Sequence, residues 1–271
     1  MRVIITGGTG LMGRALTADL ASDGHRVIVL SRDPASVPEM AAKTEVVAWD
    51  ARTARGWAHL ADGAVAIVNL AGATLKRRWT ARYKQVIRES RLHAGQTVVE
   101  AVEEATSRPR IVIQASGTGC YGPRSDEVIT EQAPLGDGFL GRTAAAWEAS
   151  TAPVEKLGVR RAVIRSGVVL SNDGGAFPLM ALPFRLFVGG PLGSGRQWFS
   201  WIHMEDEVRA IRFLIKEESA QGPFNLTAPH PATNREFSRV LRAGMDRPTI
   251  IRAPPLAIRL APGAMSTVLL A

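Results

Sequence analysis

Cysteine is nearly absent from this sequence, because Cys120 is the only one among 271 residues. A single cysteine excludes an intramolecular disulfide framework and is typical of a reducing compartment. No run of about 18 apolar residues occurs, so we expect no membrane span. No basic segment or small-residue cleavage site accompanies the first apolar run, which predicts that no signal peptide is present. Together these absences predict a cytoplasmic protein.

Several catalytic signatures are missing as well. His, Cys, Asp and Glu do not occur at the spacing of metal ligands, so we expect no metal. The Gly-x-Ser-x-Gly motif is absent, which argues against a hydrolase with a nucleophilic serine. Tyrosine occurs only at Tyr83 and Tyr121, so few phenol groups are available for proton transfer.

Positive charge is abundant but dispersed. The formal net charge is +8 at pH 7, and the arginines are spread along the chain with only short clusters, such as residues 76–78. A basic patch interleaved with aromatic residues, or a known nucleic-acid module, is not visible. We therefore expect a small-molecule substrate rather than nucleic acid as the partner, and a monomer or homodimer.

Strand and helix patterns alternate up to about residue 170. Segments with helical spacing separate several of the apolar, β-branched runs. Such alternation predicts an α/β protein, with a Rossmann-like doubly wound parallel sheet. We expect residues 1–170 to form an NADP-binding domain and residues 171–271, where Gly and Pro become dense, to form a smaller C-terminal substrate lobe. The expected strands of the first part are 3–6, 27–30, 46–48, 65–70, 111–115 and 162–164.

A glycine-rich turn follows the first predicted strand, with the spacing Gly7-x-x-Gly10-x-x-Gly13. Gly7 permits a tight turn, Gly10 lets the backbone approach a pyrophosphate, and Gly13 lets the next helix pack closely. The start of that helix offers free N–H groups and a positive dipole to phosphates. Because a strand precedes the motif and a helix follows it, the sequence predicts a dinucleotide site. The residues expected to contact the cofactor here are Gly7, Thr9, Gly10, Leu11, Met12 and Gly13.

The end of the second predicted strand indicates which dinucleotide binds. An NAD site usually places an acidic residue there, whereas this chain has Ser31 and Arg32. A guanidinium can pair with a 2′-phosphate and stack on adenine, so we predict NADP (NADPH). Asp50 closes the third strand, where it could accept from the adenine amino group or simply form a turn. Small residues at 69–72 close the fourth strand and leave room for the cofactor ribose.

The chain resembles the short-chain dehydrogenase/reductase superfamily in its extended form. It is most similar to the atypical epimerase-family branch (NAD-dependent epimerase/dehydratase-like), and the resemblance extends over nearly the whole chain. The segments that carry the resemblance are 6–13, 31–32, 69–72, 90–91, 121–122, 147–148, 165–170, 183–185, 189–197, 201–203, 223–229 and 233–237.

The resemblance implies further cofactor contacts. It places Leu70 and Ala71, beside Gly72, against the dinucleotide, Arg91 near it, and Val168 at the nicotinamide end. Ala115, Ser116 and Arg142 complete the expected cofactor-binding set. The resemblance also implies that relatives run some tens of residues longer, so the end of this chain at Ala271 is either natural or a truncation.

The superfamily's usual catalytic residues are missing. They are a Ser or Thr followed by Tyr-x-x-x-Lys, in which the lysine lowers the tyrosine pKa. The helix expected at 139–148 contains neither Tyr nor Lys. Ser116, Thr118 and Tyr121 are the candidate catalytic residues, although the motif of Tyr121 usually makes it structural. Glu131, Asp137, Glu148 and His203 are candidate acids that more often serve as surface, turn or capping groups.

A glycine-rich loop at 189–197 is the expected substrate-binding element. Arg196 and Gln197 can grip an anionic or hydroxylated substrate, and Trp201 can supply an apolar wall. The alternative is a structural loop that covers the sheet edge.

Three interpretations of function remain open. The first is an NADP-dependent oxidoreductase or nucleotide-sugar-type epimerase with non-standard catalytic residues and an unknown substrate. The second is a non-catalytic NADP(H)-binding redox sensor or partner-binding protein, which the missing Tyr and Lys favour. The third is a basic protein that binds nucleic acid with the same fold.

Overall fold

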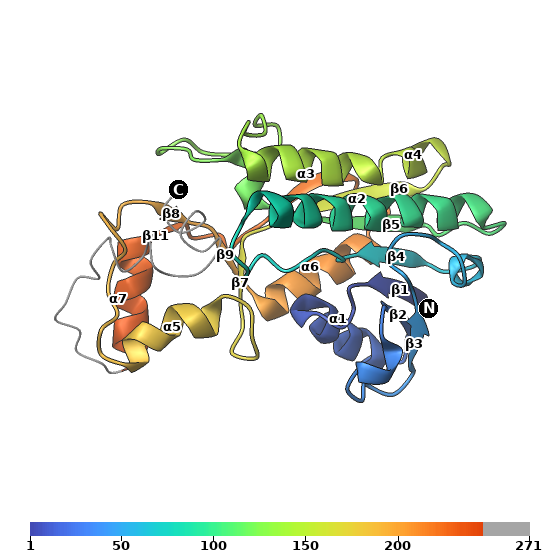
Figure 1. Ribbon diagram of the computed structural model, residues 1–271, viewed down its shortest axis with the longest axis horizontal. Coiled ribbons are helices and arrows are strands. Elements are labelled where there is room, and N and C mark those ends of the chain that lie inside the picture. Colours follow the sequence, from blue (N-terminus) through green and yellow to red (C-terminus); the bar gives the residue numbers. More distant parts are fainter. Residues whose placement is uncertain (246–271) are drawn as a thin grey trace.

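A computed structural model describes residues 1–245 of the chain, and a seven-stranded parallel sheet forms its centre (Figure 1). The strand order is β10-β6-β5-β4-β1-β2-β3. Every expected strand of the first part is present. The inner strands are buried on both faces of the sheet, whereas β3 at its edge is only partly buried. The strands are β1 (Arg2–Thr6), β2 (Arg26–Ser31), β3 (Thr44–Ala48), β4 (Ala66–Asn69), β5 (Ile111–Gly117), β6 (Arg160–Ser166) and β10 (Gly222–Leu226).

Helices cover both faces of the sheet, as a doubly wound fold requires (Figure 1). Helices α1 (Leu11–Ser22) and α6 (Met204–Lys216) lie on one face, and α2 (Ala81–Glu104), α3 (Phe139–Ser150) and α4 (Pro153–Lys156) lie on the other. Side chains alternate along β1, so Val3 and Ile5 join the core under α1 and α6, while Ile4 joins the core under α2. The 3-10 helices η1 (Pro34–Ser36), η2 (Ala58–Leu60) and η3 (Thr118–Tyr121) lie in connections.

The sheet continues after residue 170. Helix α6 covers the sheet, and β10 pairs in parallel with β6. We predicted that residues 171–271 form the smaller lobe, and the sheet topology corrects that prediction for these two elements. The physical reason is the apolar stripe of α6, which includes Val208, Ile211 and Leu214 and packs into the core of the large sheet.

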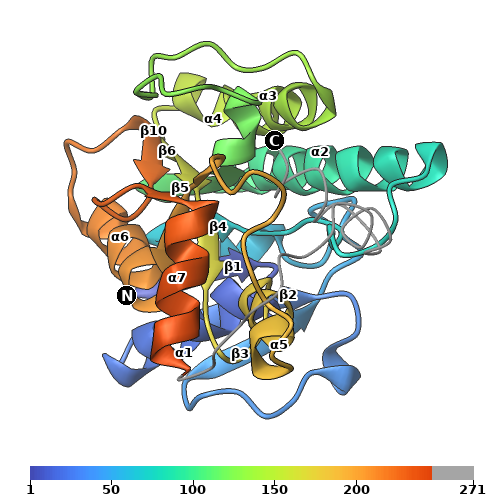
Figure 2. The same ribbon diagram turned by 90° about the vertical axis from the view of Figure 1, so that its left-hand side faces the viewer.

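A smaller lobe sits over one end of the sheet (Figure 2). It contains α5 (Phe177–Arg185) and α7 (Asn234–Gly244). Helix α7 begins with a capping box between Thr233 and Glu236. Strands β8 (Trp198–Phe199) and β11 (Ala232–Thr233) pair antiparallel, and β7 (Val168–Leu170) pairs in parallel with β9 (Trp201–His203). The β7–β9 pair connects the lobe to the sheet, because β7 follows β6 directly.

Residues 246–271, the last part of the expected lobe, lie outside the described residues. The two alternatives for the chain end at Ala271 fall on these residues. Within residues 1–245, no helix has the length and apolar character that crossing a membrane requires.

Candidate functional site

The switch point of the sheet lies between its neighbouring strands β1 and β4. The chain leaves β1 toward α1 on one face and leaves β4 toward α2 on the opposite face. Ligands of open α/β sheets bind at the carboxyl ends of the strands at such a point. The predicted glycine turn follows β1, and residues 69–72 end β4, so the fold brings these two segments together.

The glycine turn is packed too tightly for side chains. Gly7 has φ +69°, and a Cβ there would lie 2.9 Å from the Leu70 carbonyl oxygen and from the Ala71 nitrogen. A Cβ on Gly13 would lie 2.5 Å from both the Gly7 carbonyl oxygen and the Gly8 Cα. Gly7 therefore allows the turn to contact the end of β4, and Gly13 allows α1 to rest on the turn.

The N-terminus of α1 is open. Its N-cap is Gly10, which provides no side-chain hydrogen bond, and the first turn holds no acidic residue. The first N–H groups of a helix lack intrahelical partners and carry partial positive charge. Thr9, Leu11 and Met12 surround this end. Backbone N–H groups and a glycine cradle are the donor set that a pyrophosphate needs, so the residues present fit a dinucleotide.

A buried polar chain fixes the carboxyl ends of three adjacent strands. The Thr6 hydroxyl donates to Asn69 Oδ1 at 2.6 Å, and Asn69 Nδ2 donates to Gln114 Oε1 at 2.8 Å. All three side chains are fully buried, and Thr6 Oγ1 also accepts from the Ala71 N–H at 3.3 Å. These contacts were not predicted from the sequence. Their signal is a polar residue near the end of three otherwise apolar strands.

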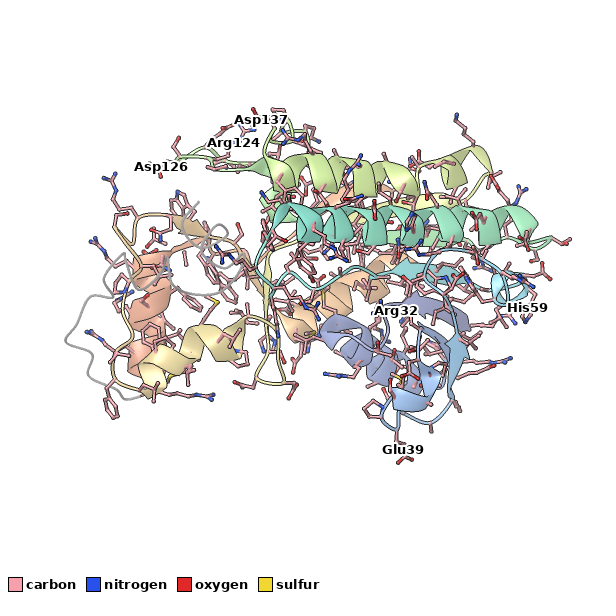
Figure 3. All side chains as sticks on the ribbon, viewed as in Figure 1. Arg32, Glu39, His59, Arg124, Asp126 and Asp137 are labelled. Atoms are coloured by element: carbon pink, nitrogen blue, oxygen red, sulfur yellow. The ribbon has the colours of Figure 1, made fainter. Side chains whose placement is uncertain are left out.

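Ser31 and Arg32 lie where β2 ends. Ser31 Oγ accepts from the Asp33 N–H at 3.3 Å, which holds the start of the loop. Arg32 is exposed, and Figure 3 labels it near the middle of the view. None of the ion pairs within residues 1–245 involves Arg32. Its guanidinium is therefore available to a ligand at the end of β2.

Asp50 forms a turn. Its Oδ1 accepts from the N–H groups of Arg52 and Thr53, each at 2.8 Å, and its Oδ2 accepts from the Thr53 hydroxyl at 2.8 Å. These hydrogen bonds lower the pKa of Asp50 below its usual value. The geometry thus favours the turn-forming alternative for this residue over adenine recognition.

Arg91 reaches from α2 to the end of β4. Its Nη1 donates to the carbonyl oxygens of Ala73 at 3.2 Å and Ile87 at 3.0 Å, and its guanidinium lies 4.8 Å from the centre of the Trp147 ring. A Cβ on Gly72 would come within 2.9 Å of the guanidinium carbon. Burial lowers the pKa of Arg91 to about 10, and no carboxylate of the described residues pairs with it. A cation held this way favours an anionic ligand beside residues 72–73.

An ion pair occupies the side of β5 and β6 that faces α3. Arg165 Nη2 donates to Glu148 Oε2 at 2.8 Å, and its Nε donates to Oε1 at 3.0 Å. The side chains are 7% and 12% exposed, so the pair is buried. The Ser116 hydroxyl donates to the same Glu148 Oε1 at 2.6 Å. Ser116, a candidate catalytic residue, is therefore a partner of this ion pair.

Tyr121 belongs to the same network. Arg165 Nη1 donates to the Tyr121 hydroxyl at 2.9 Å, which donates in turn to Asn225 Oδ1 at 2.6 Å. Asn225 is also held, because its N–H donates to Glu131 Oε1 at 2.9 Å. Burial raises the pKa of Tyr121 above its usual value. These contacts match the structural role that its motif suggests.

Most of the remaining predicted residues lie at or beside the ends of strands, whereas Arg142 lies on a helix. Val168 and Trp201 are direct partners in the β7–β9 pair, so the expected nicotinamide end and substrate wall adjoin. Thr118 opens η3, after Ala115 and Ser116 at the end of β5. In contrast, Arg142 is exposed on α3 and donates to the carbonyl oxygen of Asp137 in the preceding loop.

The glycine loop at 189–197 is tied to α7. The Asn234 N–H donates to the Gln197 carbonyl oxygen at 2.9 Å, and Gln197 Nε2 donates to the Leu192 carbonyl oxygen at 3.0 Å. Arg196 is exposed at the same place. His203 caps α6, where its Nδ1 accepts from the Glu205 N–H at 3.3 Å, in line with the capping role considered above.

Two cavities open on the surface of the described residues. One of about 170 Å³ opens beside Thr9 and Arg14 and is bounded by residues 37–41. The other, of about 460 Å³, lies between residues 53–59 and the last turns of α2, and Figure 3 shows His59 at that end of the molecule, far from the lobe. Only the smaller one adjoins the glycine turn. Among residues 1–245, no group of three His, Cys, Asp or Glu side chains could hold a metal ion.

The model of the NAD dependent epimerase/dehydratase family matches residues 3–150, which is more than half of the chain. The chain belongs to this family. An epimerase family protein of Staphylococcus aureus is 42% identical over 98% of this chain and 88% of its own length. A second epimerase family protein, from Staphylococcus epidermidis, is 40% identical over 99% of this chain and 89% of its own length.

Solved structures of similar proteins share the fold of this chain. A crystal structure of the human epimerase family protein SDR39U1 with NADPH has a TM-score of 0.85 and 33% identity, over 99% of this chain and 89% of that chain. A nucleoside-diphosphate sugar epimerase from Corynebacterium glutamicum has a TM-score of 0.76 and 33% identity, over 100% of this chain and 58% of that chain. These findings bear out the resemblance and the predicted Rossmann-like fold.

Helix α3 departs from the usual catalytic pattern of the superfamily. It provides the buried side chains Thr143, Ala144 and Trp147 and the ion-paired Glu148, with neither Tyr nor Lys. From the sequence, Glu148 was expected only as a candidate acid that is usually a surface group. Its buried pairing with Arg165 was not predicted, because the two residues are far apart in sequence and only the packing of α3 on β5 and β6 brings them together.

Proposed function

We propose that this protein is an NADP(H)-dependent oxidoreductase that interconverts a small carbonyl compound and its alcohol, with nucleotide-sugar-type epimerisation as a related reaction. The observation that carries the proposal is the open N-terminus of α1, held by Gly7 and Gly13 against the end of β4. The crystal structure of the human relative with NADPH supports the same cofactor here. The bound dinucleotide would supply the hydride chemistry.

Different parts of the site would hold different parts of the cofactor. The N–H groups of Leu11 and Met12 would bind the pyrophosphate. Gly7, Thr9, Gly10 and Gly13 would shape the turn, in which the Gly10 N–H donates to the Gly7 carbonyl oxygen at 2.9 Å. The ribose would be lined by Leu70, Ala71 and Gly72, beside Arg91. The nicotinamide end would be lined by Ala115, Ser116 and Val168. Arg196, Gln197 and Trp201 would contact the substrate. Arg142 and Asp50 have the weakest geometric support, because each is engaged in its own turn or loop.

Arg32 is the proposed determinant of NADP over NAD. It follows β2, it is exposed, and it is free of ion pairs within residues 1–245. A hydrogen bond between a guanidinium and a phosphate contributes about 1.5–3 kcal/mol. Arg32→Ala should therefore weaken NADPH binding roughly 10- to 100-fold and leave NADH binding unchanged. Titration of both dinucleotides by fluorescence or calorimetry measures this.

Arg26→Ala is the matched control. Arg26 begins the same strand, and its side chain pairs with Glu45 at 2.7 Å on the surface. Removing it changes the net charge by the same amount at the opposite end of β2, so NADPH affinity should stay at the wild-type level. Equal affinities of the wild type for NADPH and NADH, or an unchanged NADPH affinity in Arg32→Ala, would refute the role of Arg32.

Turnover distinguishes the proposed enzyme from a binding protein. The wild type should oxidise NADPH when a panel of small aldehydes, ketones and oxidised sugars is supplied. The second candidate is a non-catalytic NADP(H) sensor, which is favoured by the engagement of Ser116 and Tyr121 in the network around Arg165. A sensor would bind NADPH without turnover and would change its oligomeric state or partner binding with the cofactor redox state.

We infer a cytoplasmic protein with a small-molecule substrate, because the sequence has a single cysteine and its positive charge is dispersed. Its one cysteine, Cys120, is free and buried, and burial raises the pKa of its thiol to about 12. A thiol of this kind is unreactive, so Cys120 is not part of the proposed chemistry.

A further inference from the structure

The proposed reaction needs a proton donor, and two of the three expected catalytic residues, Ser116 and Tyr121, are already engaged. The Ser116 hydroxyl donates to Glu148, and Glu148 pairs with Arg165. The Tyr121 hydroxyl lies between Arg165 and Asn225. Glu131 accepts from the Asn225 N–H. Ser116 and Tyr121 therefore belong to the network around the Arg165–Glu148 ion pair.

A different pair lies on the other face of the sheet. The Ser166 hydroxyl, at the carboxyl end of β6, donates to Glu207 Oε1 at 2.6 Å. Glu207 comes from the first turns of α6 and is fully buried, although glutamate is rarely buried without a charged partner. Its Oε2 is also buried and has no hydrogen-bond partner among the described residues.

Burial raises the pKa of Glu207 to about 7, while the hydrogen bond from Ser166 opposes this only in part. Glu207 therefore carries a proton over much of the neutral range. A carboxylic acid both donates and accepts, so the short contact with Ser166 can pass a proton either way.

No charged group close to Glu207 among the described residues competes with the effect of burial. Strands β5 and β7, which pack on α6, contain no charged residue. In α1, Arg14 is exposed and Asp19 pairs with Arg212 at 2.7 Å. In β9, His203 is exposed and caps α6. Arg165 of β6 points to the opposite face, where it pairs with Glu148.

Ser166 lies where the reacting carbonyl is expected. It is the register partner of Gly117 in β5, directly before Thr118, and it precedes Gly167 and Val168, the expected nicotinamide end. A Cβ on Gly167 would lie 2.9 Å from the Trp201 nitrogen, so the predicted substrate wall is also adjacent. Ser166 is half-buried, unlike Glu207. The Ser166 hydroxyl therefore lies between the buried Glu207 carboxyl group and the edge of the sheet where the strands have their carboxyl ends.

We propose that Ser166 and Glu207 form a proton relay that replaces the missing Tyr-x-x-x-Lys, with Ser166 as the catalytic residue and Glu207 as the positioning residue that acts through it. This proposal rests on the proposed oxidoreductase function. In carbonyl reduction, the Ser166 O–H bond breaks and its proton bonds to the substrate oxygen, while the carbonyl carbon accepts the hydride. The Glu207 proton moves to Ser166 Oγ, and the resulting carboxylate regains a proton from water after the product leaves. In alcohol oxidation every transfer runs in reverse.

The first test needs neither cofactor nor substrate. In protein labelled with ¹³C at the glutamate carboxyl carbons, one resonance should titrate near neutral pH and should be missing from Glu207→Gln. Glu205→Gln is the matched control, because Glu205 lies in the same helical turn but is exposed. That control should keep the neutral titration. A wild type in which every glutamate titrates near pH 4.5 would overturn the relay.

The second test follows turnover. Glu207→Gln keeps the size and hydrogen-bonding ability of the side chain but cannot release a proton, so kcat should fall about 100-fold or more. The KM and NADPH affinity should stay within about twofold of the wild type, and the pH-rate limb near neutrality should disappear. Ser166→Ala should lower kcat as strongly, and Ser166→Thr should restore part of it. Glu205→Gln should retain the wild-type rate and pH profile.

The outcomes separate the two proposals. If the wild type turns over and Glu207→Gln retains both its rate and its pH profile, the relay is wrong and the oxidoreductase function stands. If the wild type binds NADPH but reduces no carbonyl compound, the proposed function is wrong and the relay falls with it. If Glu207→Gln does not fold, Ser166→Ala decides the matter, because removing one half-buried hydroxyl leaves the fold intact; an unchanged rate in that variant overturns the relay.

Discussion

At the scale of single residues, Arg165 contacts three separate parts of the chain, which its neighbours in sequence would not suggest. Its guanidinium pairs with Glu148 of α3, donates to the Tyr121 hydroxyl and reaches the Glu131 carbonyl oxygen at 3.0 Å. The contacts with Glu148 hold the pKa of Arg165 above its usual value. Two buried opposite charges with full hydrogen bonding depend on each other, since either one alone would be an uncompensated charge.

Removing one partner of this pair should therefore be costly. Arg165→Met should lower the free energy of unfolding by about 3–5 kcal/mol, because it leaves the Glu148 carboxylate buried without its partner. Urea denaturation at neutral pH measures the change. Arg26→Met removes an exposed ion pair, whose side chains are 57% and 46% accessible, and should change the stability by about 1 kcal/mol or less. Equal effects of the two variants would contradict the structural role of Arg165.

At the scale of elements, the junction of β1 and α1 is built from close backbone contacts. The helix can begin directly after the strand only because Gly13 rests on Gly7 and Gly8. The same contacts set the direction of the open helix N-terminus toward the end of β4. Stability and the proposed dinucleotide binding would thus depend on the same glycine.

Gly13→Ala should impair both. The new Cβ would lie 2.5 Å from the Gly7 carbonyl oxygen, so α1 must shift away from the turn. Overpacking of this kind costs about 1–3 kcal/mol, and we expect thermal stability and NADPH affinity to fall together. Gly138→Ala is the control, because Gly138 precedes α3 and a Cβ there would meet no atom of the described residues within 4 Å. An NADPH affinity that survives Gly13→Ala would show that the turn does not bind the pyrophosphate.

At the scale of the whole molecule, the buried carboxyl of Glu207 links global stability to pH. Its pKa rises from 4.5 to about 7 on folding, so the native state binds a proton that the unfolded state releases. The resulting stabilisation is fully present below about pH 4.5 and is lost as the pH rises through about 7.

Glu207→Gln should remove this dependence. Between about pH 5 and pH 8, the wild type should lose about 2–3 kcal/mol more unfolding free energy than the variant, at about 1.36 kcal/mol for each pKa unit of difference. Urea denaturation of both proteins at the two pH values measures the difference. Glu205→Gln should follow the wild type, since Glu205 is exposed. Parallel pH profiles for the wild type and Glu207→Gln would mean that Glu207 is not held as a neutral acid.

Much of the architecture could be predicted because its signals are local. Apolar runs at 3–6, 27–30 and 111–115 bury both faces of a strand wherever the strand lies in the sheet, and they are β1, β2 and β5. The turn from Gly7 to Gly13 is also local in its positive φ and in the packing of Gly13 on Gly7 and Gly8. The contact of Gly7 with Leu70 and Ala71, in contrast, comes from the pairing of β1 with β4. The position of β10 could not be predicted in this way, because nothing in residues 222–226 specifies β6 as the partner.

The sequence by itself determined the strand and helix alternation, the glycine turn, and the guanidinium after β2, because each depends on neighbouring residues. Only the tertiary structure decided what the polar groups do. Glu205, Asp206 and Glu207 look equivalent in a first helical turn, where acids are favourable. The apolar stripe of Met204, Val208 and Ile211 turns Glu207 alone into the core, against Ser166. Burial and pairing are long-range properties, and they separate an ordinary surface carboxylate from the acid proposed for catalysis.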